Sequence, residues 1–256
     1  MNLDGQVAVV TAGAAGLGLH IARAVAARGA RVVIGDIDVD AGRAAVAQIE
    51  SEGGDATFRA ADVTDDEQLD ELITAASHVG PFRAFVNNAG GWSAGEHQYP
   101  DAASAEWTRT LDLNLRAPMV ATQLCRASMQ ASGGGAVVNI ASSAALGPDA
   151  YGSPEYGAAK AGLIRFTSSV RGLTGVGIRV SCVVPHWIGL PRARAEFDRM
   201  PQEEQVRSGG LVDPEVVAAT VVALIEDDTS GGRIVAIRPG GSAYPLDPAG
   251  IDPRWP

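Results

Sequence analysis

The amino-acid sequence predicts an α/β fold in which one doubly wound parallel sheet of about seven strands carries helices on both faces. Short apolar runs rich in β-branched residues alternate with longer alanine-rich stretches that have helical spacing. Runs that are apolar throughout are typical of parallel strands buried on both faces. No internal repeat, low-complexity tract or linker interrupts the alternation. We therefore expect residues 1–256 to form a single domain.

Composition restricts the class of partner. The 256 residues carry a formal net charge of -10, which argues against nucleic acids and anionic membranes as partners, because both attract basic surfaces. A phosphate-containing cofactor stays compatible, since backbone N–H groups can hold it. No basic segment followed by an apolar one opens the chain, and no apolar run reaches the roughly 20 residues of a membrane span. We expect a cytoplasmic protein.

The two cysteines, Cys125 and Cys182, lie in apolar segments. We expect them to be buried free thiols rather than a disulfide. No group of cysteines and histidines has the spacing of a metal site, so no metal is expected.

The predicted elements follow the pattern in order. Strands are expected at the β-branched runs, which are residues 7–11, 31–35, 57–61, 84–87, 136–140, 179–184 and 233–237. Three helix starts are marked: Thr64 to Glu67 has the form of a capping box, and Ser153 and Asp213 each precede a proline at the first helical position. The polar residues 190–210 interrupt the alternation, so we expect an irregular segment there that serves as a substrate lid.

The first predicted strand leads into a glycine-rich turn from Thr11 to Gly18, with a helix expected to begin near His20. Glycines at such a junction let the backbone approach a pyrophosphate, which then lies at the helix N-terminus, as in Rossmann-type folds. By itself the turn could serve packing alone.

The second predicted strand ends at Asp36, about 20 residues beyond the glycines, where an acidic side chain can hydrogen-bond an adenosine ribose. A carboxylate there also repels a 2′-phosphate, and neither Ala15 nor Ile37 supplies a cation to attract one. These residues favour NAD over NADP. The plainer alternative is a solvated loop aspartate.

The third predicted strand runs into Asp62 and Val63, and the fourth into Asn88, Ala89 and Gly90. Residues at the carboxyl ends of parallel strands line the crevice where ligands bind. Taken alone, the second group would be assigned to a turn.

A chemical site is indicated by Tyr156 and Lys160, which share one face of a predicted helix because they are four residues apart. A phenol has a pKa near 10, and a neighbouring ammonium group favours the phenolate. Such a pair can take or give a hydroxyl proton while a hydride moves to or from a nicotinamide. On spacing alone, an ordinary exposed helix pair is the commoner interpretation.

Two further polar residues are candidates for the same site. Ser142 follows the fifth predicted strand and could hydrogen-bond the reacting oxygen, or it could simply cap a turn. Asn114 interrupts an apolar helix. A buried asparagine must be hydrogen-bonded, so it is either a structural tie or part of a polar relay.

Together these residues, in this order and spacing, resemble the short-chain dehydrogenase/reductase family, in its single-domain NAD(P)-dependent branch. The resemblance runs from the glycine turn to Gly240 and Gly241. It implies a general acid/base role for Tyr156, an ammonium on Lys160 that activates Tyr156 and holds the nicotinamide ribose, a substrate-positioning role for Ser142, and a water-ordering role for Asn114. It also implies a homotetramer or homodimer.

The resemblance further implies which residues bind the cofactor. These are Thr11, Gly13, Gly16, Leu17, Gly18, Asp36, Asp62, Val63, Asn88, Ala89, Gly90, Tyr156, Lys160, Pro185 and Ile188. The substrate pocket is expected to include aromatic and polar side chains around the catalytic helix and the lid. The candidates are Trp92, Ser143, Tyr151, His186 and Trp187, with Tyr99 as a further wall residue.

Four departures from the family pattern matter. Ala12 replaces the first turn glycine, which we expect to be tolerated if the backbone there is not left-handed. His186 replaces a glycine and could titrate near neutral pH. Leu190 replaces a threonine that hydrogen-bonds the cofactor. The loop before Tyr156 is one residue longer than usual, so counting back from it selects Ser143, whereas counting from the strand selects Ser142; we prefer Ser142.

The sequence thus predicts an NAD-dependent oxidoreductase acting on a small-molecule secondary alcohol or ketone. A catalytically silent protein that binds NAD(H) as a sensor is the alternative, because cofactor folds can be reused without chemistry. Sugar-nucleotide epimerisation is a third interpretation, although the chain is short for the extra substrate domain of such enzymes.

Overall fold

The computed structural model describes residues 1–92, 97–146 and 152–246. They form one sheet with the strand order β3-β2-β1-β4-β5-β6-β7-β8. Every neighbouring pair is parallel except β7 and β8, which pair antiparallel. The predicted doubly wound α/β sheet is confirmed, with one strand more than the seven expected. The additional strand, β8, is a short edge strand of four residues.

The seven predicted runs all form strands, with shifts of one or two residues at their ends. The bounds are β1 Val7–Thr11, β2 Arg31–Asp36, β3 Asp55–Ala60, β4 Phe82–Asn87, β5 Gly135–Ile140, β6 Ile178–Pro185, β7 Ile234–Ile237 and β8 Ala243–Leu246.

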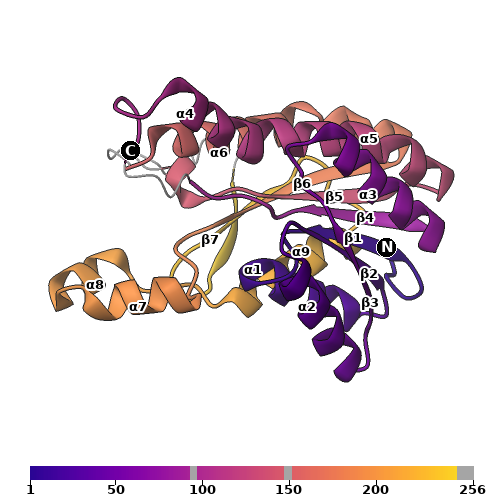
Figure 1. Cartoon of the computed structure of the whole chain (residues 1–256), viewed down its shortest axis with the longest axis horizontal. Coiled ribbons are helices and arrows are strands. Elements are labelled where there is room, and N and C mark those ends of the chain that lie inside the picture. Colours follow the sequence, from indigo (N-terminus) through magenta and orange to yellow (C-terminus); the bar gives the residue numbers. More distant parts are fainter. Residues whose placement is uncertain (93–96, 147–151, 247–256) are drawn as a thin grey trace.

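Helices cover both faces of the sheet (Figure 1). Their bounds are α1 Gly16–Ala26, α2 Val39–Ser51, α3 Asp66–Val79, α4 Ser104–Leu111, α5 Ala117–Ala131, α6 Pro154–Ser169, α7 Pro191–Arg199, α8 Gln202–Ser208 and α9 Pro214–Glu226. Shorter helical segments are η1 Asp112–Arg116, η2 Ser143–Ala145 and η3 Arg171–Val176. None of the helices in the described ranges is both long and apolar enough to cross a bilayer.

Two apolar cores lie between the sheet and the helices, one on each face of the sheet. On one face, α1, α2 and α9 pack on alternate residues of the strands. On the other, α3 and α5 cover the central strands, and α6 covers β5 to β7. Alternate side chains of the strands enter opposite cores: Val183 faces α9, whereas Cys182 and Val184 lie in the cluster that contains Ile164 of α6.

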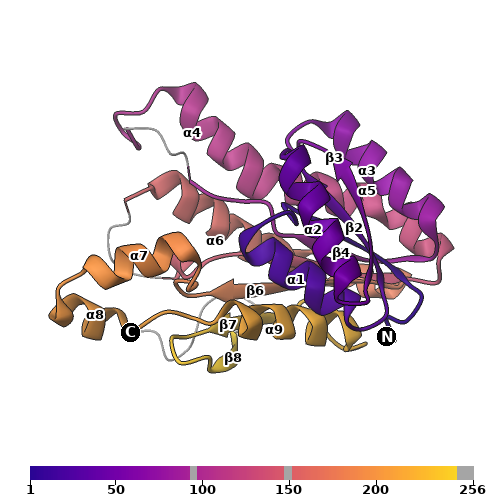
Figure 2. The ribbon, with the colours of Figure 1, turned by 60° about the horizontal axis from the view of Figure 1, so that its bottom comes forward.

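Two local expectations were wrong. The capping residue of α3 is Asp65 rather than Thr64: its carboxylate accepts from the backbone N–H groups of Glu67 and Gln68 at 3.0 and 3.2 Å, and Gln68 donates back to it. Residues 190–210 are not irregular, because they contain α7 and α8. Figure 1 and Figure 2 show these two helices projecting from the body of the domain.

The sheet order places the reversal point between β1 and β4. The chain moves outward from β1 to β3 and then returns to β4 on the other side of β1. The loops after β1 and β4 therefore diverge at the carboxyl edge, which creates the crevice where ligands bind in open α/β sheets.

Candidate active site

The crevice at this reversal point is an open cleft of about 680 Å³. Its walls come from the ends of β1 to β4 and from one side of α4. The residues that line it include Ala12, Asp36, Ile37, Asp62, Val63, Ala89, Gly90 and Trp92. Its volume is in the range of small-molecule and cofactor sites. Most of the predicted adenosine-side residues thus meet in one place.

The glycine turn is built for close backbone contact. A methyl group on Gly18 would lie 1.9 Å from the Ala12 carbonyl oxygen, so only glycine fits there. The helix α1 begins at Gly16, four residues earlier than expected, and Ala15 at its N-cap provides no side-chain hydrogen bond. Its first backbone N–H groups are therefore open to a phosphate, and the turn fits the pyrophosphate of a dinucleotide.

Thr11 and Asn88 join the turn to β4. The Thr11 hydroxyl accepts from the backbone N–H groups of Asn88 and Ala89, each at 3.0 Å, and donates to the Val86 carbonyl at 3.2 Å. The Asn88 side chain donates to the carbonyl oxygens of Thr11 and Ala12. These two predicted residues hold the walls of the cleft together.

Ala12 adopts a left-handed backbone with φ 48°, the only described residue other than glycine with positive φ. We expected alanine to be tolerated at this position only if its backbone is not left-handed. The backbone is left-handed, so this condition is not met. For a residue with a Cβ, the left-handed conformation costs about 1–2 kcal/mol. The Asn88 side chain donates to the Ala12 carbonyl oxygen at 3.2 Å, and Gly18 packs closely against the same oxygen, so tertiary contacts hold the turn in this shape.

Replacing Ala12 by glycine should therefore stabilise the protein. We expect the free energy of unfolding to rise by up to about 1 kcal/mol, since relief of the backbone strain exceeds the extra chain entropy of glycine. Chemical denaturation measures the change. Ala24→Gly is the control, because Ala24 lies inside helix α1 and has no left-handed backbone to relieve; it should lower stability by about 1 kcal/mol. Equal destabilisation by both changes would contradict the strain argument.

Asp36 lies where a ribose-binding carboxylate is expected. Its Oδ2 accepts from the Ala14 N–H and its Oδ1 from the Asp38 N–H, each at 3.1 Å. The carboxylate thus also fixes the glycine turn. The neighbouring Ile37 side chain is 73% exposed at the cleft. An exposed apolar side chain next to a carboxylate fits an adenosine better than it fits a 2′-phosphate.

Asp62 and Val63 flank the far side of the same cleft. The Asp62 carboxylate accepts from the Thr64 N–H and hydroxyl at 2.9 and 2.7 Å, while its own N–H donates to Gln68. Val63 is buried in the core under α3. Asp62 is therefore held in place by the first turn of the helix that follows it.

Asn114 is fully buried in η1, a π-helical turn between α4 and α5. Its side-chain amide donates to the Gly91 and Thr110 carbonyl oxygens at 2.7 and 2.8 Å and accepts from the Gly91 N–H at 3.0 Å. Of the two roles left open, the structural tie is present. Turns of π-helix inside α-helices are frequent at functional sites.

The Lys160 side chain extends from α6 to the carboxyl end of β5, and Lys160 is 3% exposed. Its ammonium donates to the Ile140 carbonyl oxygen at 2.8 Å. A methyl on Gly90 would lie 2.9 Å from this ammonium and 2.8 Å from Asn114 Oδ1, so Gly90 leaves room for both. Burial lowers the pKa of Lys160 from 10.5 to about 8, and the neighbouring Cys182 opposes that shift weakly.

Tyr156 and Lys160 are neighbours, as predicted. The Lys160 Nζ lies 5.6 Å from the centroid of the Tyr156 ring. The Trp92 ring stands edge-on to the Tyr156 ring, with centroids 5.8 Å apart. Tyr156 is 9% exposed, whereas Trp92 is 43% exposed. The phenol therefore sits between a buried cation and an aromatic cover at the mouth of the site.

Ser142 follows β5 and caps η2: its hydroxyl accepts from the Ala144 N–H at 3.2 Å. The capping role is thus present, and the same oxygen keeps a proton that it can donate. Ser143 is half-buried in the first position of η2. Both serines lie at the strand end beside Lys160, which contacts Ile140 two residues earlier.

The segment after β6 lies beside the glycine turn and Trp92. Leu190 packs close to Gly16, with its Cδ1 3.5 Å from the position of a methyl there. The Arg192 guanidinium lies 5.0 Å above the Trp92 ring, and Trp187 packs edge-on to Phe197 of α7. Pro185 is buried at the end of β6, and Ile188 forms a bridge with Val212.

The sequence analysis missed some residues that line the cleft, and some of the residues that it named are not found in the cleft wall. Glu106, Arg109 and Thr110 line the cleft from α4, and their helical spacing with Leu113 could have revealed this face. Arg192 lies within the predicted lid, residues 190–210, but was not singled out as a site residue. Tyr99 is 56% exposed, and Tyr151 lies outside the described residues. No group of three or more His, Cys, Asp or Glu residues in the described ranges could hold a metal.

Comparison with known proteins agrees with this geometry. Residues 6–200 match the family described as short chain dehydrogenase. The chain is 31% identical over 254 residues to a subunit of (2S)-[(R)-hydroxy(phenyl)methyl]succinyl-CoA dehydrogenase from Thauera aromatica, covering 95% of this chain and 99% of that protein. It is 30% identical to the NAD(+)-dependent 15-hydroxyprostaglandin dehydrogenase of Bos taurus, covering 93% and 92%. A crystal structure of an actinorhodin polyketide ketoreductase with NADPH has a TM-score of 0.83 and 27% identity, covering 94% of this chain and 98% of that one.

Proposed function

The chain belongs to the short-chain dehydrogenase/reductase family, and on this basis we propose that it transfers a hydride between NAD(H) and a secondary alcohol or ketone. The observation that carries the proposal is the buried Lys160 ammonium beside the Tyr156 ring, held by Ile140 and spaced by Gly90. Burying a cation costs free energy, and an ammonium next to a phenol adds nothing to apolar packing that would offset this cost. Such a pair beside a dinucleotide-sized cleft therefore indicates a functional role.

Each residue of the site has a separate role in the proposed reaction. The Tyr156 hydroxyl exchanges the proton of the substrate oxygen, and the Lys160 ammonium favours its phenolate form. Ser142 donates a hydrogen bond to the same oxygen and stabilises charge that develops there; Ser143 is the alternative donor. Asn114 holds Gly91 and keeps the wall beside Lys160 rigid, and we propose that it also orders a water beside Lys160. The nicotinamide, when bound, supplies the position that accepts or returns the hydride.

We propose NAD rather than NADP as the cofactor. The relatives do not decide this point, since one is named for NAD(+) and one solved neighbour holds NADPH. Asp36 supports NAD, because its carboxylate lies at the ribose end of the cleft and would repel a 2′-phosphate. The glycine turn, Asp62, Val63 and the Asn88–Gly90 segment would form the rest of the cofactor site, with Pro185 and Ile188 on the nicotinamide side.

Asp36→Asn should weaken the preference for NAD+. The amide keeps one oxygen that can still accept from the Ala14 N–H, so the contact with the glycine turn is preserved; the charge and the second contact, with the Asp38 N–H, are removed. We expect the ratio of kcat/KM for NAD+ to that for NADP+ to fall by at least about tenfold, equivalent to about 1.4 kcal/mol. Steady-state kinetics with both cofactors measure it, with Asp38→Asn as control. An unchanged ratio would contradict the role of Asp36.

The substrate side is lined by aromatic residues and by the lid. We propose that α7 and α8 form this lid and that Trp92, His186 and Trp187 contact the substrate, with Arg192 closing against Trp92. Loops and helices that cover a site commonly exclude water and commit the substrate. The aromatic walls favour a substrate with an apolar or ring-shaped body.

An absorbance assay for NADH formation tests the function. Purified protein is mixed with NAD+ or NADP+ and a panel of secondary alcohols, polyols, sugars and hydroxysteroids. We expect turnover of at least one class with NAD+. Absence of turnover across the panel together with tight NADH binding would instead favour an NAD(H)-sensing protein.

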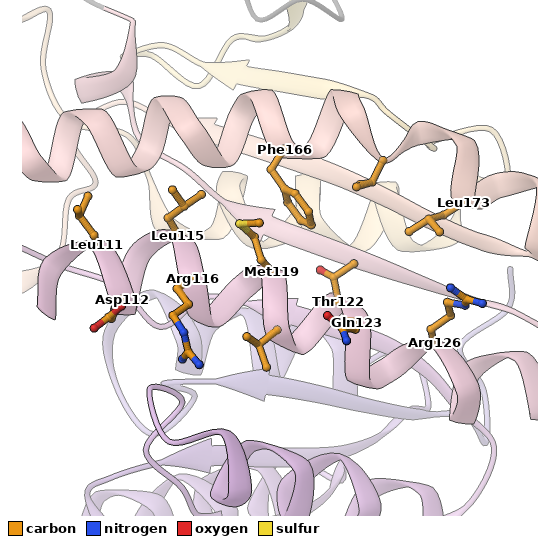
Figure 3. A pocket seen from close by; sticks show the side chains of 12 residues that line it. Leu111, Asp112, Leu115, Arg116, Met119, Thr122, Gln123, Arg126, Phe166 and Leu173 are labelled. Atoms are coloured by element: carbon orange, nitrogen blue, oxygen red, sulfur yellow. The ribbon is translucent and has the colours of Figure 1, made fainter. Parts of the chain in front are cut away.

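We also propose a homo-oligomer, either a homotetramer or a homodimer. An apolar groove between α5 and α6 is lined by Leu115, Met119, Phe166 and Leu173 (Figure 3). Asp112 and Arg126 stand at its opposite ends, about 21 Å apart along the helix. Antiparallel packing of two copies around a twofold axis would bring Arg126 of one copy to Asp112 of the other. Arg116, which also lines this groove, is already paired with Asp66. Light scattering should give a multiple of the 26.3 kDa chain; a monomeric mass would contradict this.

A further inference from the structure

His186 occupies a defined position in the sheet. Its N–H donates to the Ile237 carbonyl at 2.9 Å and so continues the ladder between β6 and β7. Because side chains alternate along a strand, His186 lies on the same face as Cys182 and Val184. That face is covered by α6, the helix that carries Tyr156 and Lys160.

The imidazole of His186 has an unused polar atom. Its Nδ1 is buried and has no hydrogen-bond partner within the described part of the chain. Buried polar atoms are nearly always hydrogen-bonded, so a buried nitrogen without a partner at the carboxyl end of β6 points to a missing ligand group. Burial lowers the pKa of His186, and the neutral ring carries one donor and one acceptor nitrogen.

The relative positions of the Ser142 and His186 backbones follow from the strand pairing. Ile140 pairs with Val183, and the Ala141 N–H donates to the Val183 carbonyl at 2.8 Å. Ser142 and His186 therefore emerge from adjacent strands, which lie about 4.8 Å apart. A group bound by His186 would thus lie on the far side of the serine from the cofactor cleft, one strand away from the reacting oxygen.

We propose that His186 hydrogen-bonds a second oxygen of the substrate, so that preferred substrates carry a hydroxyl or carbonyl group one or two carbons from the reacting carbinol carbon. The inference rests on the proposed function and narrows its substrate class to 1,2- and 1,3-dioxygenated compounds. Oxygens in such compounds are separated by one strand spacing or less, which matches the two adjacent strand ends.

The test compares cyclohexanol with cis- and trans-cyclohexane-1,2-diol. Their affinities are measured by calorimetry for the protein–NADH complex, which cannot oxidise an alcohol, and turnover with NAD+ is measured separately. The variants are His186→Phe, which keeps a ring without nitrogen, and His186→Gln, which keeps hydrogen-bonding capacity. His78→Phe makes the same change on the exposed side of α3 and serves as control.

We expect the wild type to bind one of the diols at least about tenfold more tightly than cyclohexanol, the size of one well-placed buried hydrogen bond. His186→Phe should abolish that preference and leave cyclohexanol affinity within about threefold, while His186→Gln should restore part of it. His78→Phe should change nothing. Thermal unfolding shows whether each variant is folded.

Three outcomes would overturn the inference. The wild type could bind diols and cyclohexanol equally, or the preference could survive in His186→Phe. Alternatively, His186→Phe could weaken NADH affinity and affect all alcohols alike, which would assign His186 to the cofactor. Failure of the proposed function is a separate result, because it shows as absent turnover irrespective of these affinities.

Discussion

Tyr156→Phe is expected to lower kcat by about 1,000-fold, the usual contribution of a general acid/base group. The phenylalanine ring keeps the edge-on contact with Trp92 and the neighbouring Lys160 ammonium. Only the hydroxyl that exchanges the substrate proton is removed. The cleft that would hold the cofactor is lined mainly from other elements, so NADH affinity should stay within about threefold.

Tyr244→Phe is the matched control for this loss. Tyr244 lies in β8 under Arg238, whose guanidinium is 4.3 Å from its ring, and the phenyl ring can keep that contact. We expect turnover close to that of the wild type. Retained turnover in Tyr156→Phe, or an equal loss in the two variants, would remove Tyr156 from the chemistry.

Lys160→Met is expected to lower kcat/KM by about 100-fold or more, since the charge that favours the Tyr156 phenolate is lost. Lys160 is the only lysine in the sequence, and every other basic side chain apart from histidine is an arginine. An arginine would not serve at this position: its larger guanidinium has no room beside Gly90 and Asn114. Lys160→Arg should therefore fail to restore activity.

The stability of Lys160→Met separates function from folding. Burial lowers the pKa of Lys160 to about 8, so below pH 8 the fold carries a buried ammonium at a cost on the order of 3 kcal/mol. That cost disappears as the pH rises from about 8 through 10.5, the value in the unfolded chain. Methionine removes the charge but leaves the Ile140 carbonyl without its donor.

We therefore expect Lys160→Met to unfold at the same or a higher temperature than the wild type at pH 7, and the wild type to gain stability relative to the variant between pH 8 and 10.5. Thermal unfolding across this pH range measures both. Loss of activity with a matching loss of stability at pH 7 would mean that Lys160 is structural.

Much of the fold could be predicted because the signal for buried parallel strands is local. Each run of β-branched residues forms a strand, and the glycine turn lies at the reversal of strand order. The edge strand β8 was missed because Ala243–Leu246 is short, half exposed and contains a proline. Helices α7 and α8 were missed because their faces are polar and pack little against the core.

The site residues could be placed on strand ends and on α6, but their contacts depend on tertiary packing. Sequence alone could not show that Ala12 has a left-handed backbone, because the shape of this turn depends on tertiary contacts such as the hydrogen bond from Asn88, which follows β4. Nor could it show the π-helical turn at Asn114, whose amide partners come from Gly91. Nor could it show that His186 Nδ1 is buried without a hydrogen-bond partner in the described part of the chain, because this depends on which groups the neighbouring strands place around it.

The proposed function depends on one step, the direct passage of a hydride between a carbinol carbon and the nicotinamide under control of Tyr156. This step can be followed with a secondary alcohol that carries deuterium on the carbinol carbon. The alcohol is taken from the class that the panel identifies, or every alcohol of the panel is used in labelled form. We expect deuterium in the NADH produced and a slowed hydride-transfer step in rapid mixing. Tyr156→Phe should form this labelled NADH about 1,000-fold more slowly. NADH that forms without deuterium, or formation of labelled NADH by Tyr156→Phe at the wild-type rate, would contradict the proposed mechanism.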